Sequence, residues 1–186
     1  MIREPALNPK AQPPIIVFVS LPIPDPAPPS AFKYRLPVTL AVAGGPGFTG
    51  YVSLSKQSEF RPGPQTLLER FNERVRIVPL VDGDVTHLVA RDLIEWVEGG
   101  PGVDSALFGP AVFAVTRIER ACVSLRSGRV LEGLIAMEMP EGYNRTSDFI
   151  NGDDDFFVLC CGERTLLVNK RRLRDLRLDP SRPPGC

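Results

Sequence analysis

Residues 123–137 read VSLRSGRVLEGLIAM, with apolar and polar side chains alternating on both sides of Ser127-Gly128. Residues 38–54 read VTLAVAGGPGFTGYVSL and show the same alternation around a run of glycine and proline. Alternation with a period of two is typical of β-strands, and glycine between two such strands is typical of a hairpin turn. The sequence therefore predicts two β-hairpins, with strands at 38–42 and 48–54 and at 121–126 and 129–137.

The same order of elements follows each hairpin. A short helical turn is expected next, with Thr66 or Thr146 as its N-cap, although Ser147 could serve as well. Tight turns are predicted at Asp82-Gly83 and Cys161-Gly162. The strands predicted around and after these turns are 76–81, 86–90 and 94–98 in the first half and 156–161, 165–169 and 173–178 in the second.

From Asn72 onward, corresponding residues of the two halves keep a constant separation of 79 positions. The corresponding pairs are Asn72 and Asn151, Leu80 and Leu159, Leu88 and Leu167, Val89 and Val168, Arg91 and Lys170, Ile94 and Leu173, and Val97 and Leu176. An ordered series at one separation indicates an internal duplication. Five short strands with little helix indicate a small SH3-like or Sm-like β-barrel. Because a unit of about 60 residues buries a marginal core, the two copies are expected to pack together.

The sequence therefore predicts a mostly β protein of two tandem homologous small barrels, each with a short helical turn, behind a Pro-rich N-terminal arm. The predicted boundaries are 1–37 for the arm, 38–98 for the first barrel, 99–111 for a linker, 112–178 for the second barrel and 179–186 for a tail. Ten of the 20 prolines fall in the arm, which favours an extended conformation. Its one β-competent stretch is Ile15, Ile16, Val17, Phe18 and Val19, which should pair with a sheet edge of this chain or of a partner.

Composition narrows the class of protein. The chain has 186 residues, with 22 Lys and Arg against 22 Asp and Glu. A net charge of zero gives no support to non-specific nucleic-acid or membrane-surface binding. The longest apolar run near the start is too short to span a membrane. The four cysteines, Cys122, Cys160, Cys161 and Cys186, form no disulfide framework, which favours a cytoplasmic protein. The excess of arginine, 18 against 4 lysines, suggests a GC-rich bacterial source.

The stretch from Val123 to Leu134 resembles the first hairpin of Sm-like proteins, including a glycine that bends its second strand. The segments 144–151, 157–159 and 167–170 are similar to uncharacterised bacterial small-barrel proteins. The resemblance implies an SH3-like or Sm-like barrel. At the place where the Sm family has Asp-x-x-x-Asn for RNA, this chain has Met139-Pro140-Glu141-Gly142.

A weaker resemblance concerns PilZ domains, which bind cyclic dinucleotides. Arg70 and Arg74 fit the Arg-x-x-x-Arg part of the PilZ pattern. The second part of the pattern, Asp/Asn-x-Ser-x-x-Gly, does not occur in the chain. Cyclic-dinucleotide sensing is therefore kept as the weakest of three functional alternatives.

Candidate catalytic, metal and phosphate groups each have a structural interpretation that the sequence favours. His87 is the only histidine and has no evident nucleophile beside it. Asp153-Asp154-Asp155 lacks the alternating spacing of a calcium loop, so a solvated loop is expected. The glycine-rich residues 44–50 lack the Lys-Ser/Thr of a P-loop and are interpreted as a hairpin turn. Cys160-Cys161 has no Cys-x-x-Cys spacing for zinc.

The last part of the second copy is basic, with six basic residues and one acidic residue between 164 and 177. The residues that would contact phosphate there are Lys170, Arg171, Arg172, Arg174 and Arg177. No aromatic residue interleaves with them to stack on bases. A nucleic-acid-binding barrel is therefore the second functional hypothesis.

The first hypothesis is a non-enzymatic protein-interaction, adaptor or assembly module that uses barrel surfaces and the N-terminal arm. It predicts no catalytic residue, metal or cofactor and no membrane contact. The expected partner is another protein or a second copy of the chain.

Overall fold

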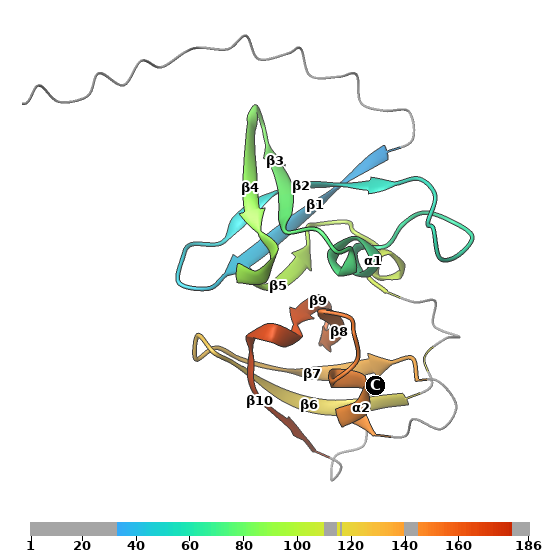
Figure 1. Ribbon diagram of the computed structural model, residues 1–186, viewed down its shortest axis with the longest axis vertical. Helices are drawn as coiled ribbons and strands as arrows, with labels where there is room; N and C mark the ends of the chain where they lie inside the picture. The colour runs from blue at the N-terminus through green and yellow to red at the C-terminus, as the bar shows by residue number, and fades with distance from the viewer. Residues whose placement is uncertain (1–32, 110–114, 116, 140–144, 180–186) are drawn as a thin grey trace, which may run out of the picture. The chain divides into compact units, whose positions relative to one another are not determined.

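The computed structural model describes residues 33–109, 115, 117–139 and 145–179, and its elements are labelled in Figure 1. The helical elements are α1 (Leu67–Asn72), η1 (Arg91–Leu93), η2 (Ser105–Leu107), α2 (Thr146–Ile150) and η4 (Lys170–Arg172). The strands are β1 (Lys33–Val42), β2 (Phe48–Ser55), β3 (Ile77–Asp82), β4 (Val85–Ala90), β5 (Ile94–Gly99), β6 (Arg117–Leu125), β7 (Val130–Met137), β8 (Phe156–Cys161), β9 (Arg164–Asn169) and β10 (Leu173–Leu178).

These ten strands form one antiparallel sheet in the order β10-β6-β7-β8-β9-β5-β1-β2-β3-β4. The prediction of two closed barrels is therefore wrong. The reason is the pairing of β5, which takes β1 on one side and β9 of the other half on the second side. Because β5 pairs across the halves and not with β4, neither half closes on itself. Strands β4 and β10 are left at the two ends of the sheet.

The two halves have the same order of elements. The bounds of β3, β4, η1 and β5 recur 79 residues later in β8, β9, η4 and β10. The order of pairing also recurs, as β5-β1-β2-β3-β4 in the first half and β10-β6-β7-β8-β9 in the second. Descent from a duplication stays a prediction. Below, residues 79 positions apart are called matched.

Two hydrophobic cores meet at the β8–β9 hairpin, which is buried on both faces. Phe156 and Leu167 belong to the core of the first half, together with Phe71. Phe157 and Val168 belong to the core of the second half. The rings of Phe71 and Phe156 lie 5.5 Å apart between centroids. Successive side chains of a strand point to opposite faces, so one hairpin contributes to both cores. The expected packing of the two halves against each other is thus observed.

The local predictions succeed at the turns and at one of the two helix caps. Gly83 and Gly162 have positive φ values of 57° and 63° in the predicted tight turns. Thr66 caps α1 in a capping box with Glu69. Thr146 does not cap α2, since Arg145 holds that position and Thr146 is the first helical residue. The Thr146 hydroxyl instead donates to Glu119 on β6, at 2.5 Å.

The predicted arm is only partly testable. Strand β1 begins at Lys33, so residues 33–37 belong to the sheet and not to an arm. Residues 15–19, the predicted strand of the arm, lie outside the described residues. Within the described part of the chain, no helix is long and apolar enough to cross a membrane.

Candidate functional site

The β3–β4 hairpin exposes apolar side chains on one face. Val78, Leu80 and Val89 point into the first core, and the alternate residues point away from it. We call the face that points away the outer face; it is formed by Ile77, Pro79 and Leu88. Ile77 is 44% exposed and Leu88 is 70% exposed. A large exposed aliphatic side chain on an end strand is a feature that folded proteins usually avoid.

The matched face of the β8–β9 hairpin is buried. Phe156 is 1% exposed, Val158 is 7% exposed and Leu167 is fully buried. These three side chains pack in the first core, across the boundary between the halves. The same place in each hairpin is thus covered in one half and open in the other.

The outer edge of β4 has no strand beside it among the described residues. An unpaired edge presents a row of backbone N–H and C=O groups that can bind another strand. Val85, at the start of β4, is 55% exposed along this edge. The unpaired edge of β4 and the outer face of the β3–β4 hairpin together form the candidate site.

The strand at the other end of the sheet, β10, also has one unpaired edge among the described residues, and its apolar side chains are only partly covered. Leu173 and Leu176 are half-buried and pack beside the second core. Their matched residues on β5, Ile94 and Val97, are fully buried in the first core. The second half therefore lacks the cover that β8 and β9 give to the first.

Polar contacts show how the covered version of this contact is built. The Asn72 side chain accepts from the Phe156 N–H at 2.8 Å and donates to the Phe156 carbonyl at 3.2 Å. Arg91 donates to the Asp155 carboxylate at 2.5 Å. Asn169, which is 1% exposed, donates to the Ile94 carbonyl at 2.8 Å. We call this set of contacts, with the β5–β9 pairing, the internal joint.

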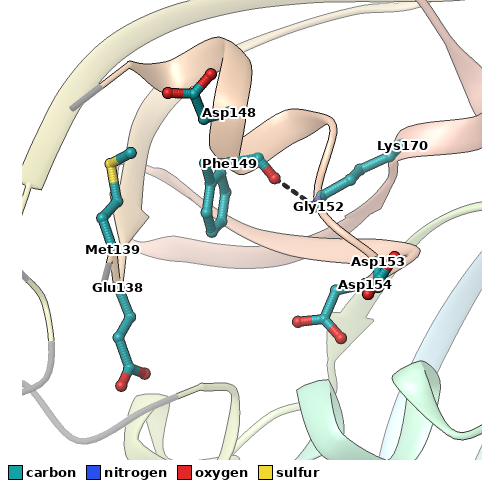
Figure 2. Close-up of a pocket in the computed structure, with 8 residues that line it drawn as sticks. All are labelled: Glu138, Met139, Asp148, Phe149, Gly152, Asp153, Asp154 and Lys170. Carbon is teal, nitrogen blue, oxygen red and sulfur yellow. Dashed lines mark hydrogen bonds between the residues drawn. The ribbon is translucent and has the colours of Figure 1, made fainter. Parts of the chain in front are cut away.

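A pocket of about 370 Å³ lies beside α2 in the second half. Figure 2 shows its lining, which includes four carboxylates and one ammonium group; the residues are Glu138, Met139, Asp148, Phe149, Gly152, Asp153, Asp154 and Lys170. The Lys170 ammonium donates to the Phe149 carbonyl at 2.7 Å, the bond drawn dashed in the figure. Burial lowers the pKa of Lys170. The pocket is acidic overall and suits a cationic group.

Four of the five basic residues predicted to contact phosphate donate hydrogen bonds within the chain. The acceptors are the Phe149 carbonyl for Lys170, the Asp155 carboxylate for Arg171, the Asp92 carbonyl for Arg172 and the Cys122 sulfur for Arg177. Arg174 is exposed on β10. Contact of this basic strip with phosphate stays a prediction.

The other candidates are placed as structural groups. The His87 ring packs on Phe48, with centroids 5.2 Å apart. Arg70 forms an ion pair with Glu73, the C-cap residue of α1. Residues 44–50 form the β1–β2 turn and the start of β2, as predicted. Among the described residues, no group of three or more Asp, Glu, His or Cys side chains is placed to hold a metal ion.

Cys160 and Cys161 are half-buried free thiols on β8. Burial raises the pKa of both thiols, which lowers the fraction of reactive thiolate at neutral pH. We expect iodoacetamide at pH 7.5 to alkylate both at least ~10-fold more slowly in the native protein than in urea. Mass spectrometry of the peptide containing them measures this ratio, and equal rates would contradict the observed burial.

No protein-family model, curated protein or solved structure matches this chain. The resemblance to Sm-like proteins therefore stays a prediction.

The open outer face is a site that the sequence interpretation missed. The sequence does show that this face is apolar in both halves. Leu88 matches Leu167, and Ile77 and Pro79 match Phe156 and Val158. Only the pairing of β5 with β9 shows that one of these faces is covered and the other is not.

Proposed function

We propose that this protein is a non-enzymatic protein-binding and assembly module that binds through the open ends of its sheet. The observation that carries the proposal is the exposure of Leu88, 70%, on an end strand whose matched leucine is fully buried. Exposed apolar side chains that are grouped on one face, as Ile77, Pro79 and Leu88 are, can mark an interaction surface. A strand edge beside such a face can add an extended segment of a partner by backbone pairing.

The experiment is copurification from the native host with the full-length tagged chain. Leu88→Glu introduces a charge at the outer face and should reduce the captured protein at least ~5-fold, since an uncompensated buried charge opposes association. Ile118→Glu is the matched control, because Ile118 is 49% exposed and lies on β6, which is in the second half and is not an end strand of the sheet. Equal capture by Leu88→Glu and the unaltered chain would contradict the proposal.

Nucleic-acid binding remains the second prediction. Nuclease treatment of the same samples tests it, together with a titration at several salt concentrations, because phosphate binding weakens steeply with salt. Loss of all captured material on nuclease treatment would replace the protein-binding proposal with this one.

A further inference from the structure

We propose that the partner of the β4 edge is a second copy of this chain, whose β10 edge pairs with β4 as β5 pairs with β9 inside the chain. This inference rests on the proposed function and names its partner. It follows from the internal joint, which shows how a fourth strand of one half and a fifth strand of the other fit together. The two sheet ends are the strands matched to that pair.

The internal joint fixes the expected register. Inside the chain, Trp96 lies opposite Val168, Val97 opposite Leu167 and Glu98 opposite Leu166. The matched pairs between two molecules are Asp175 opposite Val89, Leu176 opposite Leu88 and Arg177 opposite His87. Residues that face each other on antiparallel strands share a face of the sheet. The half-buried Leu176 would therefore cover the exposed Leu88.

The apolar surfaces also correspond. In the first half, Phe71, Ile94 and Val97 are fully buried in the core that receives the β8–β9 hairpin. Their matched residues Ile150, Leu173 and Leu176 are only half-buried beside the second core. The outer face of a second copy would complete that core, as the β8–β9 hairpin completes the first one.

One hydrogen-bonding side chain is left in place for this contact. The side-chain amide of Asn72 accepts from the Phe156 N–H through its oxygen and donates to the Phe156 carbonyl through its nitrogen. The matched asparagine, Asn151, is exposed at the end of α2. The backbone matched to Phe156 is that of Ile77, which is on the open hairpin. Asn151 would therefore bond Ile77 of the second copy.

The ion pair of the internal joint is not repeated between the two open ends. Inside the chain, a cation of the first half, Arg91, meets an anion of the second, Asp155. The residue matched to Asp155 is Arg76, which is exposed where β3 begins. Arg76 of a second copy would therefore lie opposite Lys170, another cation, and the carboxylates of Asp153 and Asp154 in the same pocket would have to balance the two charges. Lys170, in the place of Arg91, has its ammonium held by the Phe149 carbonyl.

Pairing of β4 with β10 is a head-to-tail contact between two different surfaces. Each added molecule covers one edge and brings another, so assembly continues until a ring closes or a filament forms. A dimer made of two identical β4 edges would be a different arrangement.

Light scattering after size exclusion tests the assembly with the full-length chain at about 1–100 µM, a range in which mass action reveals weak association. We expect masses above that of a dimer, from a chain of 20.4 kDa. Leu88→Glu should raise the concentration needed for assembly at least ~10-fold, while Ile118→Glu should not change it. A monomer throughout this range, or assembly unaffected by Leu88→Glu, would overturn the proposal.

Disulfide trapping tests the register. Full-length chains carrying Leu88→Cys and Leu176→Cys, with the four native cysteines replaced by serine and folding checked by circular dichroism, are mixed and oxidised. A cross-link between the two variants, and none within either alone, is expected. A cross-link of Leu88→Cys with itself would overturn the head-to-tail contact. A separate chain that carries both Leu88→Cys and Phe18→Cys tests the N-terminal segment as the occupant. A disulfide within this chain would show that the segment, and not a second copy, covers the β4 edge, which would overturn the proposal.

The two proposals can fail separately. A chain that is monomeric when pure, yet captures a different protein only when Leu88 is intact, contradicts self-assembly and supports protein binding. A monomer whose captured proteins do not depend on Leu88 contradicts both.

Discussion

Phe156→Ala is expected to lower the free energy of unfolding by about 3–5 kcal/mol, the usual loss for a buried phenylalanine. The side chain is 1% exposed and packs on Phe71, although it belongs to the second half of the chain. Its removal leaves a cavity in the first core beside the internal joint. The loss should therefore affect both halves and not one half alone.

Urea denaturation measures the effect, in a Leu88→Glu background so that association does not contribute. The single tryptophan, Trp96, packs on the second core from β5 and so reports on the internal joint by fluorescence. Far-UV circular dichroism reports on the whole sheet. The fluorescence and circular-dichroism signals should change at the same urea concentration, because the β8–β9 hairpin belongs to both cores.

The exposed Phe60 supplies the control, and Phe60→Ala should change stability by less than about 0.5 kcal/mol. Two separate transitions, or a loss below about 1 kcal/mol for Phe156→Ala, would show that the halves fold independently and that the shared hairpin contributes little.

Much of the secondary structure is predictable from the sequence because it depends on nearby residues. Strands β8 and β10 have their predicted bounds, and the predicted glycine turns follow β3 and β8. The cap of α2 is the exception. A threonine hydroxyl at the start of a helix can cap the helix or form a hydrogen bond with another group. The Thr146 hydroxyl donates to the carboxylate of Glu119 on β6, which is distant in sequence.

The closure of each half is not predictable in the same way, because it depends on which distant strand reaches the free side of β5. A signal is present nevertheless. Residues 156–159 and 166–168 are continuous apolar runs, whereas the matched residues 77–80 and 87–89 include Pro79 and His87. Continuous apolar strands are typical of strands buried on both faces. The sequence therefore contained evidence that β8 and β9 lie inside and β4 lies at an end.

The candidate site shows the same limit. The local excess of positive charge predicted the strip from Lys170 to Arg177 as the second candidate, and its contact with phosphate stays a prediction. The open edge emerges only when burial at matched positions is compared. Exposure of Leu88 is meaningful because Leu167, in the same local sequence setting, is fully covered.

Gly133→Ala is the second substitution with a large expected effect, a loss of about 2–3 kcal/mol from forced contact in a packed region. A Cβ at Gly133, on β7, would lie 2.4 Å from the Cys160 carbonyl oxygen of β8. At Gly50, in the corresponding place on β2, a Cβ would lie 2.7 Å from the Val81 carbonyl oxygen of β3. Val81 and Cys160 are matched residues, so both hairpins depend on a glycine where the next strand crosses closely.

The sign of this effect separates two explanations. Strand propensity and the restricted unfolded chain both predict that Gly→Ala stabilises a strand, by about 0.4–1 kcal/mol. Close approach of a neighbouring backbone predicts the opposite sign, because a carbonyl group cannot move aside as the end of a flexible side chain can. Gly45→Ala is the control, since a Cβ there meets nothing within 4 Å. Urea denaturation of the unaltered chain, Gly133→Ala and Gly45→Ala measures the change in the free energy of unfolding and distinguishes the two explanations. Stabilisation by Gly133→Ala would show that β7 and β8 separate at little cost in free energy.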